Sequence, residues 1–393
     1  MIDEFAQGSS NPVVRSAEWA YKHTNLVKIN EEGVAAAAQY IHKNMLATSY
    51  TPRTWRTHPL HLLPPEPFSP SDPRTRTCLD WIFLISSLNF SFWSELPERE
   101  RYGVEWREGW GAAGRRVWTG YWSLVAAINR ALEEDIPITD PSFYSDPARC
   151  PDALIEHVFR PTPQSREPIP LLRERVAIMR ENGRILCEKF GGGFQAFILS
   201  FQAARRDRGT ALQLVRAVTH AFPTFRDETV YAGRKLYFWK RAQILVAETW
   251  AAFYPASRSP PHPHPLFPGA GASIHELTMF ADYRVPQIMH HLRILSYAPE
   301  LVRALRERRG MATGGREEVA VRAGSVVGVE RVREEIRRMR RREGGEGGEE
   351  EVSSVVIDFY LWDLAKRVES GEKVAGIETV EMVPAHRTRS IWY

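Results

Sequence analysis

Apolar side chains recur at helical spacing through most of the chain, and the pattern is clear after Arg284. Four apolar residues there lie three or four positions apart, on one face of a predicted helix: Val285, Ile288, Leu292 and Leu295. Pro286 fits the first turn, where its missing backbone N–H costs nothing. Similar periodicity predicts helices in further stretches: 11–48, 77–95, 117–134, 171–190, 194–221, 239–253 and 325–342.

Proline, glycine and charged runs separate the predicted helices. We expect exposed loop insertions at 161–170, 256–272 and 342–351. Residues 352–367 start with a strand-like pattern and then become helical. Helical patterns dominate and no internal repeat is visible. The sequence therefore predicts a single, mainly α domain over residues 1–393, with a few short strands.

Composition narrows the class of protein. The chain has 393 residues, and its 43% hydrophobic and 25% charged content is ordinary for a globular protein. The formal net charge of +4 does not indicate a large nucleic-acid-binding surface. Cys78, Cys150 and Cys187 are too widely spaced for a zinc motif, and we predict no metal or other cofactor. The N-terminus lacks a signal-peptide pattern and no apolar run approaches ~20 residues, so we expect a soluble cytoplasmic protein.

The stretch before the predicted 285 helix carries polar residues of interest. Phe280 and Asp282 lie just upstream of the helix N-terminus, where the helix dipole and free N–H groups favour an ionised carboxylate. Beside an aromatic ring and Arg284, such a carboxylate could serve a reaction in which positive charge develops. The simpler interpretation, in which Asp282 caps the helix and Phe280 packs in the core, is the commoner one for this pattern.

Two further acidic residues lie in an aromatic run near the C-terminal end. Asp358 and Asp363 belong to the stretch DFYLWD, and acidic side chains among buried aromatic residues are costly unless something pairs with them. They are five residues apart and point in different directions on a helix, so we expect them to bracket a ligand rather than share a metal ion. The alternative is that both are structural aspartates held by caps or salt bridges.

Basic residues and a histidine complete the candidates. Lys240 and Arg241 begin a predicted helix beside several aromatic residues and could hold a phosphate, although a solvated basic face is the simpler interpretation. His61 lies in a proline-rich loop, and the pattern alone gives it no role. Gly191–Gly193 lack the Lys and Ser or Thr of a P-loop, so we interpret them as a helix end and turn.

Several long stretches together resemble one known family, the queuosine salvage proteins, which are queuosine 5′-phosphate N-glycosylases. The stretches occur in the family's order, cover most of the chain and are unusual in composition. They are LNFSFWSE (88–95), GYWSLVAAINRALEEDIPITDPSFY (120–144), EKFGGGF (188–194), YFWKRAQILVAETW (237–250), MFADYRVPQIMHHL (279–292), DFYLWD (358–363) and the terminal HRTRSIWY.

The resemblance implies hydrolysis of queuosine 5′-monophosphate to queuine and ribose 5-phosphate, with the queuine reused in tRNA modification. It also implies an α-helical fold similar to that of the helical DNA glycosylases. Asp282 matches the family's catalytic aspartate, and Phe280 in the same motif would stack on the flat base. An ionised carboxylate near C1′ suits this chemistry, because N-glycoside cleavage passes through an oxocarbenium-like sugar.

The resemblance also implies which residues recognise the base. Asp358 and Asp363 match family aspartates, and carboxylates accept hydrogen bonds from a guanine-type edge or pair with the amine of the base's side arm. His61 aligns with a family histidine near the base. Phe359 stands where the family often has Tyr, which keeps the ring for stacking but removes a hydroxyl. For the 5′-phosphate, our own candidates are three basic residues: Lys240, Arg241 and Arg284.

Two other functions stay open. A base-flipping glycosylase acting on polymeric nucleic acid would need a broad basic face, which the net charge of +4 does not favour. A catalytically inactive queuine-binding protein is disfavoured by the intact motif around Asp282. We therefore expect a monomer that binds queuosine 5′-monophosphate and queuine, with no stable nucleic-acid partner and no membrane association.

Overall fold

Helices account for most of the structure. The computed structural model describes residues 11–256, 263–269, 271–344 and 352–393. Within these ranges the predicted mainly α fold class is confirmed. The α-helices are α1 (Pro12–Thr24), α2 (Glu31–Ala47), α3 (Pro73–Ser87), α4 (Tyr121–Glu133), α5 (Pro141–Tyr144), α6 (Asp152–Val158), α7 (Leu172–Lys189), α8 (Phe194–Ala204), α9 (Ala211–Ala221), α10 (Lys240–Ala252), α11 (Val285–His291), α12 (Pro299–Arg306), α13 (Arg316–Arg342) and α14 (Ser354–Glu369). Shorter 3₁₀ turns are η2 (Pro52–Thr57), η3 (Pro223–Phe225) and η4 (Gly271–Glu276).

The strands of the described residues form short antiparallel pairs. They are β1 (Val27–Ile29) with β6 (Leu295–Tyr297), β2 (Gly103–Arg107) with β3 (Arg115–Thr119), and β4 (Glu228–Tyr231) with β5 (Arg234–Tyr237). In the first pair Lys28 lies opposite Ser296, so strand pairing joins segments that are far apart in the sequence. The pairs do not merge into a larger sheet within the described ranges, and helix packing therefore supplies most of the core.

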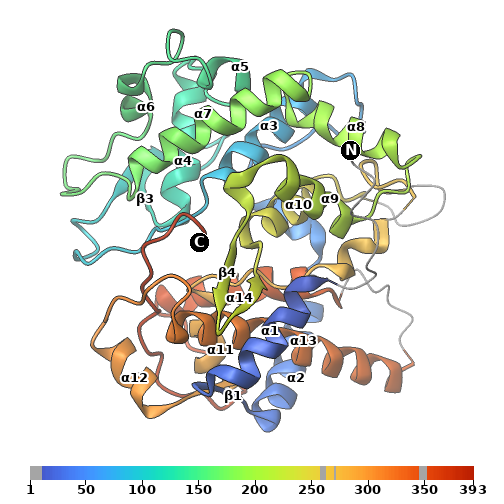
Figure 1. The fold of residues 1–393 in the computed structure, drawn as a ribbon, viewed down its shortest axis with the longest axis vertical. Coiled ribbons are helices and arrows are strands. Elements are labelled where there is room, and N and C mark those ends of the chain that lie inside the picture. Colours follow the sequence, from blue (N-terminus) through green and yellow to red (C-terminus); the bar gives the residue numbers. More distant parts are fainter. Residues whose placement is uncertain (1–10, 257–262, 270, 345–351) are drawn as a thin grey trace.

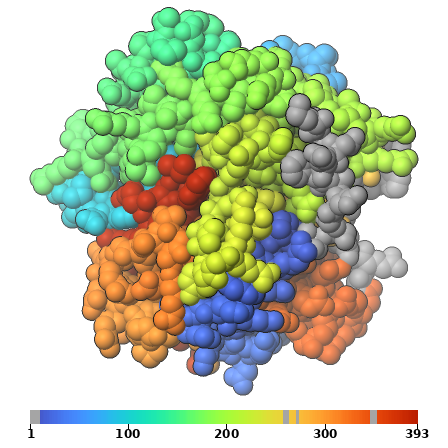
Figure 2. Space-filling model, viewed as in Figure 1, coloured from blue at the N-terminus to red at the C-terminus, as the bar shows by residue number. Residues whose placement is uncertain are grey.

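Helix α10 lies at the centre of the core. Every residue from Lys240 to Ala252 is buried, and α10 packs against α3, α9 and η2. In Figure 1, helices α3 to α8 lie in the upper half of the view, whereas α1, α2 and α11 to α14 lie in the lower half. Figure 2 shows the C-terminal segment, in red, packed between these two groups on the visible face. Side chains from both groups can therefore line one site beside α10.

Helix α13 is the long helix that supports the lower group. Its 27 residues pack against α1, α2 and α11. The helix predicted at 325–342 is confirmed but begins earlier, at Arg316, and its first half is buried although it carries Glu318 and Arg322. None of the helices in the described ranges has the length and apolar character needed to cross a membrane.

A glycine turn joins α7 to α8, as predicted for Gly191–Gly193. Gly191 and Gly192 have positive φ values of 65° and 82°, which side chains with a Cβ adopt only at a cost. The next helix then begins at Phe194, whose backbone N–H donates to Oδ1 of Asp80 at 2.7 Å. The interpretation of these glycines as a helix end is therefore confirmed.

The helix predicted after Arg284 is too long. Helix α11 ends at His291, Arg293 has a left-handed backbone with φ of 62°, and Leu295 lies in strand β6. Pairing with β1 uses the backbone groups that a longer helix would have needed. Tertiary contact therefore overrides the apolar spacing of this segment.

Other predicted boundaries also change. The helix predicted at 77–95 begins earlier, at Pro73, and ends at Ser87, and strand β1 interrupts the stretch 11–48. The strand-like start of 352–367 is wrong, because the Ser353 side chain accepts the N–H of Val356 at 3.3 Å and caps α14 there. The stretch 194–221 splits into α8 and α9, since the Gln202 side chain accepts the N–H of Gly209 at 3.0 Å and holds a turn. Residues 117–119 belong to strand β3 rather than to the helix predicted at 117–134.

The first of the expected insertions, 161–170, is a loop that packs on the protein. Thr162 and Ile169 are buried, and the backbone N–H of Thr162 donates to the oxygen of Gly103 at 2.9 Å. The loop is therefore fixed against β2 at this point. The last expected insertion, 342–351, lies outside the described residues from position 345 onward.

The expected insertion at 256–272 is described only in part, because 257–262 and 270 lie outside the described residues. His264 is buried, and its Nε2 lies 2.9 Å from the backbone oxygen of Trp250 in α10. Leu266 and Phe267 are buried as well. The expectation of an exposed loop is therefore wrong for this part.

The assignment of residues 1–393 to one domain stays a prediction.

Candidate active site

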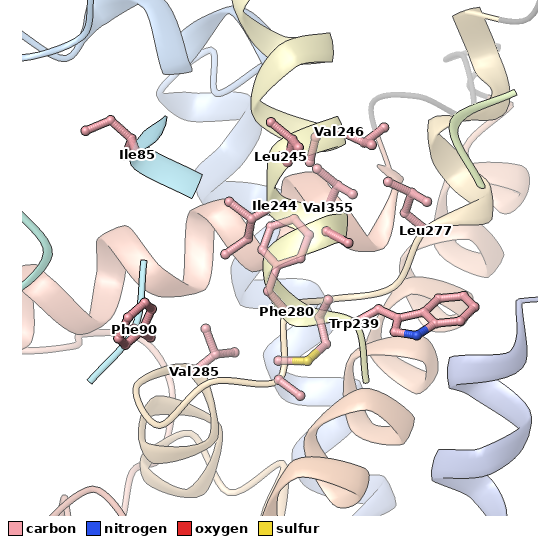
Figure 3. Close-up of a cluster of buried hydrophobic side chains, with 14 of the residues drawn as sticks. Ile85, Phe90, Trp239, Ile244, Leu245, Val246, Leu277, Phe280, Val285 and Val355 are labelled. Carbon is pink, nitrogen blue, oxygen red and sulfur yellow. The ribbon is translucent and has the colours of Figure 1, made fainter. Parts of the chain in front are cut away.

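A cavity of about 600 Å³ lies between α10, α14 and the C-terminal segment. Sites for single small molecules typically measure ~300–1,000 Å³. Residues of η2 and the start of α4 also line it, together with the loop before α11. Figure 3 shows Phe280 of that loop beside Ile244 of α10 and Val355 of α14. The cavity therefore collects side chains from segments that are far apart in the sequence.

Aromatic rings line much of the cavity. His58 stacks face to face on Trp122, with ring centroids 3.5 Å apart and an interplanar angle of 2°. Trp362 of α14 meets Trp122 edge-on at 5.7 Å. The rings of Phe280 and Phe359, both predicted to stack on a base, lie 5.9 Å apart and line the same cavity. Such a lining favours a flat ligand with exposed ring faces.

Asp282 lies at the entrance to α11, as the sequence predicts. Its Oδ1 accepts the backbone N–H groups of Arg284 and Val285, both at 2.9 Å. Its Oδ2 has no hydrogen-bond partner in the described part of the chain, and the side chain lines the cavity although the residue is only 9% exposed. One oxygen therefore caps the helix and the other is available to a ligand, so the capping and the catalytic interpretation do not exclude each other.

Burial and neighbouring groups act in opposite directions on the Asp282 carboxyl group. Burial raises the pKa of this carboxyl above its ordinary value. Lys240 is the largest opposing influence, followed by the N–H groups of Val285 and Arg284. The helix start and the ammonium group of Lys240 therefore act in the same direction, and the expectation that the helix start keeps Asp282 ionised stays a prediction.

Lys240 is the first residue of α10 and is 4% exposed. Its Nζ donates to the backbone oxygen of Asn89 at 3.0 Å and to Oδ1 of Asn89 at 3.2 Å. Burial lowers the pKa of the ammonium group to about 8, while the charge of Asp282 acts in the opposite direction. Lys240 lines the cavity, and its electrostatic coupling to Asp282 points to a role beside the carboxylate rather than to the predicted phosphate contact.

Arg241 does not line the cavity. Its guanidinium group donates to the backbone oxygens of Ser87 and Thr224. It also lies over the rings of Phe90 and Phe225, 5.1 and 5.3 Å from their centroids. Arg241 is thus held inside the core by neighbours from other elements. This placement corrects both the predicted phosphate contact and the alternative of a solvated basic face.

Asp358 and Asp363 line the same cavity, as expected of residues that bracket a ligand. Oδ1 of Asp358 accepts the backbone N–H of Phe280 at 2.9 Å, and Oδ2 of Asp363 accepts the hydroxyl of Tyr50 at 2.6 Å. Burial raises the pKa of both carboxyls, and the charge of Asp282 raises that of Asp358 further. Each aspartate therefore keeps one oxygen for a protein donor and gains from any further N–H donor that a ligand supplies.

His61 also lines the cavity, in the loop that follows η2. Its Nδ1 lies 2.6 Å from the backbone oxygen of Trp55, and the two rings stack with centroids 4.0 Å apart. Burial, together with the neighbouring His58, lowers the pKa of the imidazole to about 3. The ring is therefore neutral. Because a carbonyl oxygen can only accept, Nδ1 carries the proton and Nε2 is an acceptor.

Arg284 belongs to a charged group that lines another part of the cavity. It pairs with Glu369 at 3.2 Å, and Lys366 pairs with the same carboxylate. The charge of Arg101 lowers the pKa values of Lys366 and Glu369. Arg101 also forms an ion pair with Glu98. Burial would raise the pKa of Glu369, but Arg284, Lys366 and Arg101 together lower it. Three cations thus surround one carboxylate.

Sequence patterns alone did not single out Glu248, Arg101, Lys366 or Glu369. Glu248 lies in α10, lines the cavity and accepts the hydroxyl of Tyr121 at 3.3 Å. Burial raises the pKa of its carboxyl to about 7. A signal was present, since Glu248 is an acidic residue inside an otherwise apolar helical segment. The helix is buried on all sides, however, and helical periodicity alone does not tell a buried Glu248 from an exposed one.

The chemistry of the cavity is that of carboxylates, cations and aromatic rings. In the ranges that the structure describes, no three His, Cys, Asp or Glu side chains are grouped so that they could hold a metal ion. Fold and site together define a mainly α protein with an aromatic-lined cavity for one small molecule, into which several buried carboxyl groups face.

The chain belongs to the queuosine salvage protein family, whose sequence model matches residues 68–393. A relative from Schizosaccharomyces pombe, named queuosine 5′-phosphate N-glycosylase/hydrolase, is 37% identical over 97% of this chain and 99% of its own length. Relatives of the same name from Mus musculus and Sphaerobacter thermophilus are each 35% identical, over 96% and 97% of this chain and 97% of their own lengths. The resemblance noted in the sequence is therefore confirmed.

Proposed function

We propose that the protein hydrolyses the N-glycosidic bond of queuosine 5′-monophosphate, releasing queuine and ribose 5-phosphate so that queuine is reused in tRNA modification. The relatives support this activity, since they are named queuosine 5′-phosphate N-glycosylase/hydrolase. One observation carries the proposal. Asp282 has one oxygen held by the start of α11 and the other available in a cavity sized for a single small molecule.

The reaction gives Asp282 a defined task. As the bond between C1′ and the base nitrogen breaks, positive charge develops on the sugar. The Oδ2 of Asp282 would stabilise this charge or orient the attacking water. The water oxygen bonds to C1′ and the base leaves with the proton that the water gives up. Lys240 supports the reaction indirectly, because its ammonium group favours the ionised form of Asp282.

The base would lie against the rings of Phe280 and Phe359. A guanine-type edge presents N–H donors, which a carboxylate of Asp358 or Asp363 would accept. The second carboxylate would pair with the amine on the side arm of the base. Nε2 of His61 offers a neutral acceptor in the same cavity. Because both aspartates have raised pKa values, donors on the base would also favour their ionised forms.

The 5′-phosphate would bind where Arg284, Lys366 and Arg101 surround Glu369. Arg284 already pairs with that carboxylate, and a phosphate would compete for the same N–H donors with a larger negative charge. The three cations carry more charge than Glu369 and Glu98, the partner of Arg101, neutralise together. Of the basic residues proposed from the sequence, Arg284 is therefore the one we retain for phosphate.

We propose further that the substrate is a free nucleotide and that the protein acts as a monomer. The cavity of about 600 Å³ suits one small molecule, and its cations lie among its lining residues rather than along an extended surface. Binding to polymeric nucleic acid would require a broad basic face, and the net charge is only +4.

Chromatographic detection of free queuine tests the proposal. The purified protein is incubated separately with queuosine 5′-monophosphate, with queuosine and with a queuosine-containing tRNA. We expect release from the nucleotide, slower release from the nucleoside and none from the tRNA. Queuine binding without release from any substrate would indicate a non-catalytic binding protein. Release from tRNA would indicate a nucleic-acid glycosylase.

A further inference from the structure

A buried ion pair joins Asp227 to Arg322 outside the cavity. Asp227 follows η3 and Arg322 lies in α13, and each is 2% exposed. Nη1 and Nη2 of Arg322 donate to Oδ1 and Oδ2 of Asp227 at 3.0 and 2.5 Å. This bidentate geometry fixes both the distance between the two side chains and their relative orientation. It is therefore suited to holding two segments in one relative position.

The third nitrogen of the Arg322 guanidinium group, Nε, bonds to the segment that carries Asp282. Its Nε donates to the backbone oxygen of Ala281 at 2.9 Å. Residues 278–282 belong to no helix or strand, so Ala281 has no ladder partner for this oxygen. Asp282 is the next residue. The guanidinium group therefore fixes the backbone immediately before the proposed catalytic carboxylate.

Asp227 reaches the segment that carries Lys240. Its Oδ2 accepts the backbone N–H of Lys240 at 3.1 Å, and its backbone oxygen accepts the N–H groups of Phe238 and Trp239 at 3.0 and 3.1 Å. Trp239 has a left-handed backbone with φ of 49°, which is uncommon for a bulky residue and needs support from its surroundings. Asp227 therefore holds the turn from which α10 begins.

Packing restricts the guanidinium group of Arg322 further. It lies between the rings of Phe238 and Tyr393, with centroids at 4.0 and 4.2 Å. Its Nη1 also lies 3.3 Å from Oε1 of Glu318, one turn earlier in α13. The group thus has polar partners in its plane and rings over its faces. These contacts together hold the guanidinium group in one position, so it can position the segments bonded to it.

We propose that Asp227 and Arg322 form a positioning pair that sets the separation between Asp282 and Lys240. This inference rests on the proposed function, which gives those two residues the charges of the reaction. Gln243 of α10 and Thr278 also join the two segments, but the ion pair bonds directly to the backbone of Lys240 and to that of Ala281, next to Asp282. Misplacement of a reacting group by ~1 Å can cost about 100-fold in rate. Loss of the pair therefore lowers kcat. Queuine affinity changes little, because Phe280, the proposed base contact in this loop, is also held by Asp358 of α14, and the other proposed base contacts lie outside both segments.

The pair also acts on the charge of Lys240. Asp282 and Asp227 favour the ammonium form, whereas Arg241 and Arg322 oppose it. Loss of the Asp227 charge therefore lowers the pKa of Lys240, and loss of the Arg322 charge raises it. Two further carboxyl groups interact with this ammonium group, Glu248 and Asp358, and neither is changed in the two variants. The alkaline limb of the pH–rate profile consequently moves to lower pH when the Asp227 charge is lost and to higher pH when the Arg322 charge is lost.

The test uses Asp227→Asn, Arg322→Gln and the double variant, in which neither partner leaves the other's charge unpaired. Arg180→Gln is the control, because this arginine also bonds two backbone oxygens, at 2.6 and 2.5 Å, but does so away from the cavity, at Tyr144 and Cys150. For each protein, kcat and KM for queuine release, the Kd for queuine, the pH–rate profile and the Tm are measured.

We expect kcat to fall ~10–100-fold in the three variants, with the Kd for queuine within about twofold of wild type. The alkaline limb moves to lower pH in Asp227→Asn and to higher pH in Arg322→Gln. Arg180→Gln keeps the wild-type kcat even where its Tm falls. If a single variant does not fold, the double variant tests the proposal, and we expect the same loss of kcat in it.

A lowered Tm with unchanged kcat in the folded variants would overturn the proposal, because the pair would then be purely structural. Failure of all three variants to fold would overturn it as well, since the pair would be needed for the fold itself. A wild-type protein that releases no queuine would contradict the proposed function. Wild-type release together with unchanged kcat in the variants would contradict only the positioning pair.

Discussion

The backbone N–H of Phe280 donates to Oδ1 of Asp358 across 2.9 Å, and this bond ties the loop before α11 to helix α14. The residue proposed to stack on the base is thereby joined to a residue proposed to recognise its edge. Asp282 lies two positions further along the same loop, and its charge raises the pKa of Asp358. Recognition of the base and chemistry at the sugar thus share one buried group of residues.

Replacement of Asp358 by Asn is expected to weaken queuine binding without lowering the thermal stability of the protein. An amide oxygen can still accept the N–H of Phe280, but it cannot offer a charged acceptor to the base. We expect the Kd for queuine to rise by about 10–100-fold, which corresponds to one charged hydrogen bond. The Tm of the ligand-free protein is expected to stay unchanged or rise, because a buried carboxyl with a raised pKa is costly to ionise.

Isothermal titration with queuine and thermal unfolding without it measure these two effects. Asp152→Asn, at an aspartate with a 68% exposed side chain, serves as the control. An unchanged Kd in Asp358→Asn would remove Asp358 from the base-binding residues.

Glu248 gives a prediction about stability and pH. Burial raises the pKa of its carboxyl from 4.5 to about 7, so the folded protein holds this proton more tightly than the unfolded chain does. The cost to folding is absent below pH ~4.5, grows as the pH rises and is complete above pH ~7. Glu248→Gln removes this cost. Relative to wild type, we expect its free energy of unfolding to gain up to about 3 kcal/mol between pH 4.5 and pH 8.

Urea unfolding of both proteins at the two pH values measures the difference. The same difference between variant and wild type at both pH values would mean that Glu248 does not titrate in this range.

The pair of Lys240 and Asp282 predicts a bell-shaped dependence of kcat/KM on pH. The ammonium group of Lys240 loses its proton as the pH rises through about 8, and the positive charge beside the reacting carboxylate is lost with it. On the acidic side, Asp282 is protonated at a higher pH than an ordinary aspartate, because its pKa is raised. We expect Lys240→Gln to lower the plateau and to remove the alkaline limb. A wild-type alkaline limb that persists in Lys240→Gln would assign that limb to another group.

Arg284 is expected to contribute to phosphate recognition without contributing to binding of the free base. Arg284→Gln removes one of three cations around Glu369, so we expect KM for queuosine 5′-monophosphate to rise about 10–100-fold. The Kd for queuine is expected to stay within about twofold of wild type, since queuine has no phosphate. Arg338→Gln, at an exposed arginine of α13 outside the cavity, is the control. An equal loss of nucleotide and queuine affinity in Arg284→Gln would place Arg284 at the base instead.

The stretches that carry the family resemblance led to four residues that line one cavity, Asp282, Phe280, Asp358 and Asp363. His61, aligned with a family histidine outside these stretches, lines the same cavity. Local pattern also placed Asp282 correctly at a helix start, because the proline after Val285 and the capping geometry are encoded within a few residues. Features that depend on neighbouring residues in the chain were thus predictable.

Features that depend on distant contacts were not predictable. Arg241 follows Lys240 directly, yet one side chain is held by core carbonyls and the other lines the cavity. Asp227 and Arg322 are 95 positions apart, and no local pattern links them. The end of α11 depends on β1, a strand from the other end of the chain. In each case the outcome depends on a tertiary partner, which no local pattern encodes.

Single-turnover release of queuine by Asp282→Asn tests the central claim most directly. The amide can still cap α11 through Oδ1, so the fold and the base contacts stay in place while the charge is lost. We expect a Kd for queuine close to that of wild type and a release rate lower by ~100–1,000-fold or more. A release rate within about tenfold of wild type, at unchanged queuine affinity, would contradict the assignment of the chemistry to Asp282.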